Sequence, residues 1–261
     1  MLEKITQIVL RAGEIIRSAE SDRGVREKNG PRDLVTRYDT MVQDFLRREL
    51  LTLLPQAAFM AEEGFEETDF SAAEWRFIVD PIDGTTNFIQ GFRNSSVSVG
   101  LMHNGQIEYA VVHNPFDGEV YTAQRGHGAF LNGRRIRTVD YDMEHSLLIF
   151  GSAVYYRELV EQTLSIFNRV FPLVQDIRRF GSAALDLCYV ASGKAGLFFE
   201  CRLCPWDYAA GSLIAQEAGC LVTKLDGTPL DFDHKDSLLV GSPTAYEQFI
   251  RILKTERGAT V

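Results

Sequence analysis

The sequence predicts a mixed fold, with an α+β half followed by an α/β half, and three patterns of apolar residues support this. Two amphipathic helices are expected near the start, over residues 2–20 and 36–54. Residues 95–138 alternate in polarity between turn residues, as an antiparallel meander does. After about residue 140, strands alternate with helices, which is the pattern of an α/β unit. We therefore expect an N-terminal part of residues 1–140 and a C-terminal part of residues 141–261.

The two N-terminal helices are predicted from the spacing of their apolar residues and from their ends. In both, apolar side chains recur every three or four residues and so lie on one helix face. Residues 21–35 are polar and contain two glycines and a proline, so a loop is expected between the helices. The second helix begins at the capping pattern Thr36-x-x-Asp39 and ends at Pro55.

Three short apolar runs predict buried strands, and an acid follows each run directly. The runs cover residues 57–61, 77–79 and 196–199, and the acids are Glu62 with Glu63, Asp80 with Asp83, and Glu200. Asp207 adds a further acid at a helix start. Taken alone, each acid is also typical of a solvated surface or of a helix N-cap. Gathered in one pocket, they would offer enough hard oxygen ligands for two or three divalent ions.

The remaining elements follow from turn residues and short apolar runs. Asn104-Gly105 and Asn132-Gly133 are hairpin signals within the meander. The polar and acidic residues 65–74 predict a surface connection. In the C-terminal part, strands are expected at residues 147–150, 174–178, 196–200, 220–225 and 237–241, and helices at 156–170, 181–190, 205–218 and from 243 onward.

Composition and charge limit the class of protein. The net charge of −9 argues against a nucleic-acid partner, because such partners usually need a basic patch. No run of 18 apolar residues and no signal-peptide pattern occurs, so we expect no membrane partner and a cytoplasmic location. The four cysteines, Cys188, Cys201, Cys204 and Cys220, are expected to be reduced, although Cys201-x-x-Cys204 also has the spacing of half a zinc site or a redox pair.

The stretch from Trp75 to Phe88 carries the strongest functional signal. It runs from a strand through Asp80 and Asp83 to Gly84 and two threonines, where a short helix can begin. The free N–H groups and the dipole of such a helix start favour an anion. Two carboxylates about 4 Å apart repel by roughly 4 kcal/mol at an effective dielectric constant of about 20, so this pair calls for a cation such as Mg²⁺. The alternative is an ordinary turn in which Asp83 is an N-cap.

These motifs resemble those of the inositol monophosphatase family. Residues 80–88, Asp-Pro-Ile-Asp-Gly-Thr-Thr-Asn-Phe, are similar to its hallmark motif, and residues 206–211 with 217–219 are similar to its C-terminal signature. The pair Glu62-Glu63 and the loop before the second helix also match in kind and order, so the similarity covers nearly the whole chain. The resemblance implies a layered αβαβα sandwich of the inositol monophosphatase and fructose-1,6-bisphosphatase type, with the active site between the two parts.

The resemblance also implies a Mg²⁺-dependent phosphate monoester hydrolase with two or three ions. Glu62, Asp80 and the backbone carbonyl of Ile82 are expected to hold the first metal. Asp80, Asp83 and Asp207 are expected to hold the second, and Glu62 to border a weaker third site. A metal-activated water is then expected to attack the phosphate directly, without a covalent intermediate.

Catalytic and substrate-binding residues follow from the same resemblance. The expected catalytic set is Glu62, Thr85 and Asp39, with Thr85 paired to Asp39 and orienting the attacking water. No role follows for Glu63 beyond contact through a water or shaping of its loop. The residues expected to bind substrate are Asp83, Gly84, Thr85, Gly181, Ser182, Ala183 and Glu200.

The substrate is the least determined part of this prediction. Myo-inositol 1-phosphate is the expected ester, and fructose 1,6-bisphosphate, histidinol phosphate and adenosine 3′,5′-bisphosphate are alternatives within the superfamily. The segment Cys201-Arg202-Leu203-Cys204 matches no subfamily and lies between two expected site residues. A catalytically silent regulatory relative is a further alternative, but the expected metal ligands are all present. A homodimer is expected by analogy with the family.

Overall fold

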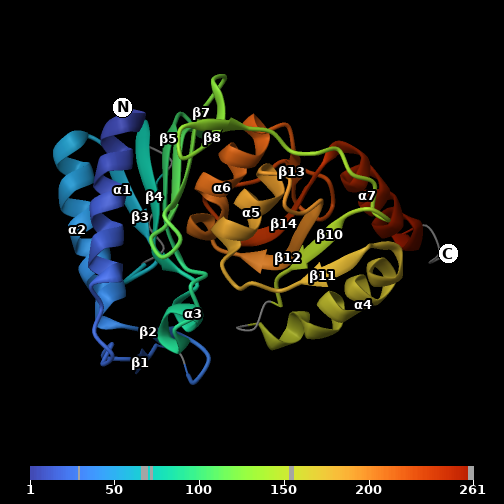
Figure 1. Cartoon of the computed structure of the whole chain (residues 1–261), viewed down its shortest axis with the longest axis horizontal. Helices are drawn as coiled ribbons and strands as arrows, with labels where there is room; N and C mark the ends of the chain where they lie inside the picture. The colour runs from blue at the N-terminus through green and yellow to red at the C-terminus, as the bar shows by residue number, and fades with distance from the viewer. Residues whose placement is uncertain (29, 66–69, 71–72, 153–155, 258–261) are drawn as a thin grey trace.

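The chain folds into five layers that alternate between helices and sheets. The structure is a computed structural model, and it describes residues 1–28, 30–65, 70, 73–152 and 156–257. Figure 1 shows α1 and α2 on one side of the larger sheet, α5 and α6 between the two sheets, and α4 and α7 beyond the smaller sheet. These helices are α1 (Leu2–Arg17), α2 (Arg37–Leu53), α4 (Val160–Val170), α5 (Ala183–Ala191), α6 (Pro205–Glu217) and α7 (Pro243–Arg257). The predicted αβαβα layering is confirmed.

The N-terminal helices form as predicted, with one addition in the loop between them. The capping box of α2 is confirmed: the Thr36 side chain accepts from the backbone of Asp39, and the Asp39 carboxylate accepts from the backbone of Thr36. The segment predicted as a loop contains a small antiparallel pair, β1 (Arg26–Glu27) and β2 (Leu34–Val35). Two-residue strands are too short to produce a periodic signal, so the prediction missed them.

The larger sheet has seven strands in the order β3 to β9. β3 pairs in parallel with β4, and every later neighbour is antiparallel, which confirms the predicted meander. Asn104 and Gly105 have φ angles of 48° and 80°, as a type I′ hairpin turn requires. The strands are β3 (Ala58–Ala61), β4 (Trp75–Asp83), β5 (Ser96–His103), β6 (Gln106–Asn114), β7 (Glu119–Gln124), β8 (Gly128–Leu131) and β9 (Arg134–Ile136).

Strand β4 is longer than the predicted run, and this changes the placement of its two acids. Asp80 and Asp83 lie inside the strand, opposite Ser98 and Ser96 of β5, so the prediction that they follow the strand was wrong. Between Asp80 and Asp83, three residue steps on β4 pair with two residue steps on β5, so β4 contains a bulge there. Residues three apart in a regular strand face opposite sides, and the extra residue brings both acids to one side. A short helix, α3 (Thr85–Gln90), follows directly.

The smaller sheet has five strands in the order β11-β10-β12-β14-β13. β10, β11 and β12 are parallel, whereas β14 is antiparallel to both of its neighbours. Glu200 lies within β12, so the prediction that it ends this strand was also wrong. The helix predicted from residue 156 starts as a 3₁₀ turn, Arg157–Leu159. The strands are β10 (Leu147–Phe150), β11 (Asp176–Arg178), β12 (Leu197–Leu203), β13 (Leu221–Thr223) and β14 (Asp236–Gly241).

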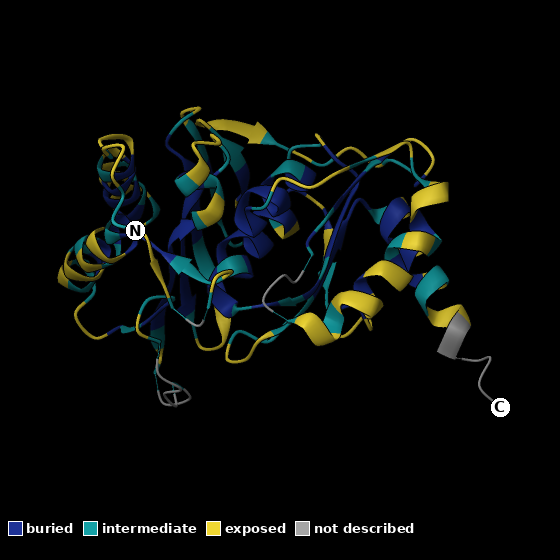
Figure 2. Cartoon of the chain, turned by 90° about the horizontal axis from the view of Figure 1, so that it is seen from below, coloured by how far each residue is buried: buried dark blue, intermediate teal, exposed yellow. Residues whose placement is uncertain are grey.

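Three hydrophobic clusters fill the spaces between the layers. Phe77 and Val79 of β4 pack in the cluster under α1 and α2, whereas Ile78 between them packs in the cluster with α5 and α6. Because both faces of the strand are buried, its apolar run is continuous instead of alternating. A third cluster holds α4 and α7 against the smaller sheet. Figure 2 shows the buried residues in the inner layers and the exposed ones on the outer helices.

Two sequence-based expectations concern the surface of the chain, a polar connection and the absence of a membrane span. Most of the predicted surface connection at residues 65–74 lies outside the described residues. Within the described part of the chain, no helix is both long enough and apolar enough to cross a membrane.

Candidate functional site

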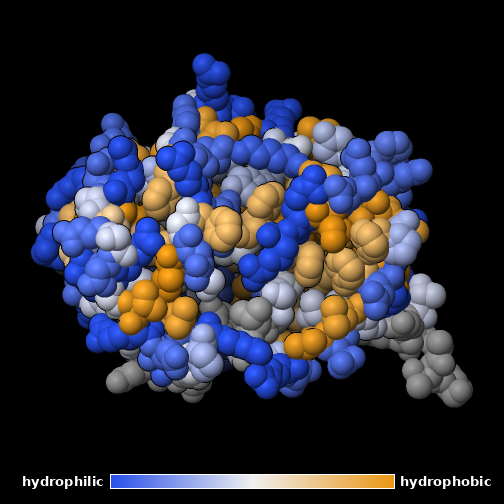
Figure 3. Space-filling view, turned by 60° about the horizontal axis from the view of Figure 1, so that its bottom comes forward, coloured by the Kyte–Doolittle hydropathy of each residue, from blue (hydrophilic) through white to orange (hydrophobic). Residues whose placement is uncertain are grey.

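The predicted site residues from both parts of the chain line one cavity of about 580 Å³. Figure 3 shows a recess near the middle of one face of the molecule. On this face, hydrophilic residues surround hydrophobic ones. One predicted residue, Asp39, lies outside the lining and contacts it through Thr85. The predicted residues that line the cavity are Glu62, Asp80, Ile82, Asp83, Gly84, Thr85, Gly181, Ser182, Ala183, Glu200 and Asp207.

Asp80 is a buried carboxylate with an oxygen that is unpartnered within the described part of the chain. Its side chain is 2% exposed, and its Oδ1 is buried without a hydrogen-bond partner among the described residues. Burial, and then the nearby charges of Glu62, Asp83 and Asp207, raise the pKa of Asp80 well above its ordinary value. A buried carboxylate in this state is costly to ionise, and a cation beside it would remove that cost.

Asp83 is held by the start of α5, about 100 residues further along the chain. Its Oδ2 accepts from the Ser182 hydroxyl at 2.5 Å and from the Ala184 N–H at 2.8 Å, and its Oδ1 accepts from the Ala183 N–H at 3.2 Å. Burial raises the pKa of Asp83 to about 6, although these hydrogen bonds oppose the shift. The alternative that Asp83 caps the helix after it was wrong: Gly84 is the N-cap of α3, and Asp83 satisfies N–H groups of α5 instead.

Glu62 and Glu63 share one lysine. The Lys28 ammonium lies 2.8 Å from Glu62 Oε1 and 2.6 Å from Glu63 Oε1. Burial raises the pKa of Glu62 to about 7, and Lys28 opposes that shift. Gln43 of α2 fixes the backbone of Glu63, since its side chain donates to the Glu63 carbonyl and accepts from the Glu63 N–H. Glu63 therefore helps to position Lys28, a contact that the sequence did not indicate.

Thr85 connects the cavity to α2. Its hydroxyl lies within hydrogen-bond distance of two oxygens, Asp39 Oδ1 at 3.2 Å and the Ile82 carbonyl at 3.0 Å. Asp39 is fully buried, and its other oxygen is occupied by the capping box with Thr36. Burial raises the pKa of Asp39, and its hydrogen bonds oppose the shift. The pair is thus fixed from both sides, with the threonine hydroxyl on the cavity wall.

Asp207 lies at the start of α6, where one of its oxygens is engaged. Asp207 Oδ2 accepts from the Cys204 N–H at 2.7 Å in a capping box. Burial, followed by the charges of Asp83 and Glu62, raises the pKa of Asp207 well above its ordinary value. All four cysteines are free thiols. The Cys201 thiol accepts a hydrogen bond from Thr163, whereas Cys204 lines the cavity. These different surroundings give no support to the alternatives that the two cysteines form a redox pair or half of a zinc site.

The turn into α3 requires a glycine and is tied to the opposite wall. Gly84 has a φ of 88°, and a Cβ there would lie 3.0 Å from the Asn94 carbonyl and 3.1 Å from the Gly181 carbonyl. Asn87, on the same short helix, donates to the carbonyls of Asn94 at 2.8 Å and Phe180 at 2.7 Å. Asn87 belongs to the hallmark motif, but only the structure shows that it joins α3 to the C-terminal part.

Several cavity residues were missed by the sequence analysis. Asp186 of α5 is 2% exposed and has an unpartnered Oδ1 among the described atoms; burial, then Asp83 and Glu200, raise its pKa well above the ordinary value. Asp186 follows Ala183 by three residues, so the two lie on the same face of the predicted helix. This spacing was the signal that could have placed Asp186 in the site. Arg179, Arg202 and Lys235 also line the cavity.

The donor set suits a hard cation, although it is not assembled around one. Within the described residues, no group of three or more His, Cys, Asp or Glu side chains is arranged to hold a metal ion. Glu62 is paired with Lys28. Asp80 has an oxygen without a partner in the described structure, and burial raises the pKa values of Asp80, Glu62 and Asp207. Carboxylate and carbonyl oxygens are the ligands that Mg²⁺ prefers.

Known proteins match this chain along nearly its whole length. A family model described as the inositol monophosphatase family matches residues 1–257. The inositol-1-monophosphatase of Rhizobium meliloti is 39% identical over 87% of this chain and 86% of its own. The Nus factor SuhB of Vibrio cholerae is 34% identical over 100% of this chain and 98% of its own. The solved structure of a Thermotoga maritima IMPase, 31% identical, superposes with a TM-score of 0.85 over 96% of this chain and 95% of its own.

Proposed function

The chain belongs to the inositol monophosphatase family, and from that premise we propose that it is a Mg²⁺-dependent phosphate monoester hydrolase. The proposed reaction converts myo-inositol 1-phosphate and water into myo-inositol and phosphate. The observation that carries the proposal is the convergence of Glu62, Asp80, Asp83 and Asp207 from both parts of the chain on one cavity. Burial raises the pKa values of all four carboxylates, and such clusters of perturbed groups in a cavity are typical of functional sites.

We propose that the metals are held by oxygens of β4, of the residue after β3 and of the start of α6. Glu62, Asp80 and the Ile82 carbonyl would hold the first ion, and Asp80, Asp83 and Asp207 the second. Glu62 would also border a weaker third site, as the family resemblance implies. Bound there, Mg²⁺ would neutralise phosphate oxygens and lower the pKa of a water. Lys28 contacts Oε1 of Glu62, so the other oxygen of that carboxylate would be the one offered to a metal.

The remaining proposed roles follow from contacts already described. The Thr85 hydroxyl, fixed between Asp39 and the Ile82 carbonyl, would orient the attacking water and pass its proton toward Asp39. The N–H groups of Gly84 and Thr85, at the start of α3, would bind phosphate oxygens. Asp83, the segment from Gly181 to Ala183, and Glu200 would face the alcohol. Positioning and charge neutralisation then provide most of the catalysis, as is usual for phosphoryl transfer.

The test is phosphate release from a panel of esters, with and without Mg²⁺. The panel contains myo-inositol 1-phosphate, fructose 1,6-bisphosphate, histidinol phosphate and adenosine 3′,5′-bisphosphate. We expect Mg²⁺-dependent release, inhibited by Li⁺ and abolished by chelator, with the inositol ester preferred. Preference for another ester would retain the reaction and change the substrate. Full activity in excess chelator would reject the metal assignment.

A second candidate function is that of a Nus factor. It is favoured by the match, along 97% or more of this chain, to relatives named Nus factor SuhB. Absence of turnover of every ester by the folded, Mg²⁺-supplied protein would support it over hydrolysis. We also propose that the chain forms a homodimer, by analogy with the family. Light scattering of the purified chain tests this proposal.

A further inference from the structure

Helix α5 contacts the N-terminal part at two points, and these lie on either side of α3 in the sequence. At its first turn, the N–H groups of Ala183 and Ala184 donate to Asp83, which precedes α3. Near its other end, the Tyr189 hydroxyl donates to Asn94 Oδ1 at 2.6 Å, and Asn94 lies beyond the end of α3. The segment that carries α3 is therefore held at both ends by one helix of the C-terminal part.

The side chain of Asn87 joins α3 to two carbonyls, and Tyr189 contacts both residues that supply them. The Asn87 amide donates to the Asn94 carbonyl at 2.8 Å and to the Phe180 carbonyl at 2.7 Å. The Tyr189 hydroxyl binds the side chain of Asn94, and its ring packs edge-on against Phe180, with the ring centroids 5.3 Å apart and the planes at 72°. Tyr189 therefore fixes both of the acceptors that hold Asn87, and α3 with it.

The residues after α3 also hold the turn before it. The Ser95 hydroxyl donates to the Gly84 carbonyl at 3.1 Å, and Ser95 is fully buried. A Cβ on Gly84 would lie 3.0 Å from the Asn94 carbonyl, so the two backbones are in close contact. A displacement of Asn94 is therefore transmitted to Gly84 and to the neighbouring Thr85, which lines the cavity.

The Tyr189 side chain is itself fixed by its surroundings. The Lys194 ammonium lies 4.8 Å from the centroid of its ring and pairs with Glu119 of β7 at 2.6 Å. Burial raises the pKa of Tyr189, so its hydroxyl stays protonated and donates. The Asn94 amide nitrogen has no partner among the described atoms, and the tyrosine hydroxyl is the partner that the structure gives to the amide oxygen. The orientation of the Asn94 side chain thus depends on Tyr189.

We propose that Tyr189 is a positioning residue of the active site, which acts through Asn94 and Asn87 to hold α3 against the start of α5. The inference rests on the proposed hydrolase function, in which the ester spans the two walls that this link joins: Thr85 of α3 orients the water, and residues 181–183 face the alcohol. Tyr189 is not part of the described lining of the cavity, so its effect on the reaction is indirect. A misplacement of about 1 Å among groups that orient reactants can cost roughly 100-fold in rate.

The test is Tyr189→Phe. This change keeps the ring and its contacts with Phe180 and Lys194, and it removes the hydroxyl that binds Asn94. We expect kcat for the preferred ester to fall about five- to twentyfold, with KM and the Mg²⁺ dependence within about twofold of the wild type. Amide hydrogen exchange of α3, followed by mass spectrometry, should become faster, because Asn87 loses a fixed acceptor.

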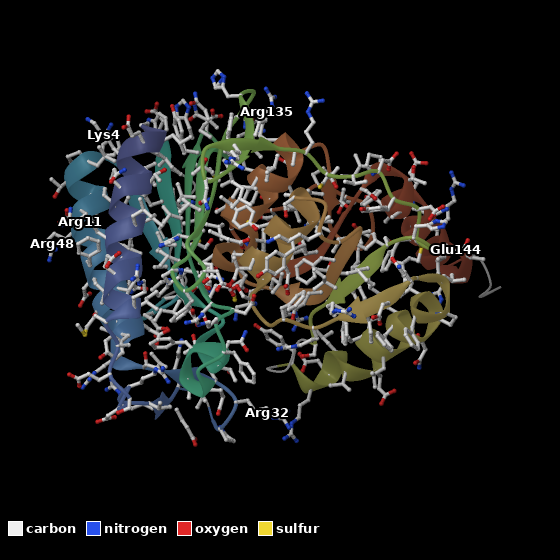
Figure 4. The ribbon with its side chains drawn as sticks, viewed as in Figure 1. Lys4, Arg11, Arg32, Arg48, Arg135 and Glu144 are labelled. Carbon is white, nitrogen blue, oxygen red and sulfur yellow. The ribbon has the colours of Figure 1, made fainter. Side chains whose placement is uncertain are left out.

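Tyr246→Phe is the matched control, because it also removes one tyrosine hydroxyl from the C-terminal part. Tyr246 is buried, and its hydroxyl lies 2.7 Å from Thr223 Oγ1. Figure 4, drawn in the view of Figure 1, shows α7 at the right, beside the labelled Glu144 and away from α3. The control should keep the wild-type kcat and the wild-type exchange of α3, even if its thermal unfolding shifts as much as that of Tyr189→Phe.

A double-mutant cycle tests the route through Asn94. Asn94→Ala removes the side chain that Tyr189 binds and keeps the carbonyl that Asn87 binds. In this background, Tyr189→Phe should lower kcat by less than about twofold further. A further loss as large as that in the wild-type background would show that the hydroxyl acts elsewhere, and it would overturn the inference.

The outcomes separate this inference from the proposed function. Mg²⁺-dependent turnover in which Tyr189→Phe keeps the kcat of the Tyr246→Phe control, or loses activity through KM alone, would overturn the inference and leave the hydrolase function intact. Absence of turnover by the wild type would reject the hydrolase function. Hydrogen exchange then decides the inference: faster exchange of α3 in Tyr189→Phe than in the control supports the link, and equal exchange overturns it.

Discussion

The two ends of the cavity are lined by charged residues of opposite sign. At the β4 end, four acids, Glu62, Asp80, Asp83 and Asp207, line the cavity, and Lys28 pairs with Glu62. At the other end, Arg179, Arg202 and Lys235 line the cavity together with Glu200. The two ends therefore differ in the sign of the ionisable groups that they present to a ligand, and the proposed metal ligands all lie at the β4 end.

The largest expected effect comes from removing a charge at the acidic end. Asp80→Asn should lower kcat by roughly 10²–10³-fold or more, because it takes a shared ligand from both proposed metals. In chelator the variant should be at least as stable as the wild type, since the buried charge that it removes is unpartnered. Phosphate release and thermal unfolding measure the two quantities. Asp44→Asn, on the exposed face of α2, is the control; near-normal turnover by Asp80→Asn would contradict the metal assignment.

The pH dependence of stability should also separate the two ends. The folded-state pKa values of Glu62 and Asp83 are raised to about 7 and about 6 from ordinary values of 4.5 and 3.8. Between these limits the folded chain binds more protons than the unfolded chain, so the free energy of unfolding should fall as pH rises from about 4 to 7. The loss is on the order of 3 kcal/mol for each group.

The measurement is urea unfolding across that pH range, in chelator and in saturating Mg²⁺. The metal should flatten the slope, because it compensates the same carboxylates. A chelator profile that rises or stays flat over this range would contradict the raised pKa values at the acidic end. Lys235→Gln, in the C-terminal part of the lining, should leave the slope unchanged.

A smaller effect is expected where Asp83 meets α5. Ser182→Ala removes a hydroxyl that donates to Asp83 at 2.5 Å, and it should lower the free energy of unfolding by about 1–2 kcal/mol. The control is Ser192→Ala at the other end of α5, where the hydroxyl bonds to backbone carbonyls of its own helix. That change should stay within about 0.5 kcal/mol. Equal losses from both variants would mean that the contact with Asp83 is not special.

The smallest predicted effect concerns the alcohol side. A Cβ on Gly151 would lie 1.9 Å from Glu200 Oε2, so Gly151→Ala must displace that carboxylate. We expect KM for the preferred ester to rise about three- to tenfold with kcat little changed. The same substitution in a Glu200→Ala background should have no such effect. Persistence of the KM change in that background would assign it to the loop and not to Glu200.

The fold was predictable where its signals are local. The capping box at Thr36 and Asp39, the Asn104-Gly105 turn and the alternating strands all depend on residues close in sequence, and each is confirmed. The ends of β4 and β12 were wrong because each strand continues through a bulge that contains polar residues, beyond the apolar run from which the strand was predicted.

Residues of the candidate site could be predicted only where they belong to a recognisable sequence motif. The acids of the hallmark motif were identified through the family resemblance, but their gathering on one cavity was not visible in the spacing. Arg179, Arg202 and Lys235 have no motif and come from three elements, so only the tertiary structure brings them together. The cap that Asp83 provides for α5 was missed for the same reason: its partners are 99 to 101 residues away.

The hydrogen bonds between Asp83 and the start of α5 affect the order in which the chain folds during its synthesis. While the ribosome has delivered only the N-terminal part, Asp83 has no α5 to bind, and the turn at Gly84 lacks the Phe180 and Gly181 carbonyls that Asn87 joins. Contacts separated by about 100 residues close late, because the entropy of a long loop must be overcome first. The larger sheet can therefore form early, whereas the cavity lacks residues of its lining until Lys235 has left the exit tunnel. A chain truncated before residue 184 is expected to contain Glu62, Asp80 and Asp83 but not Asp207, and no enclosed site.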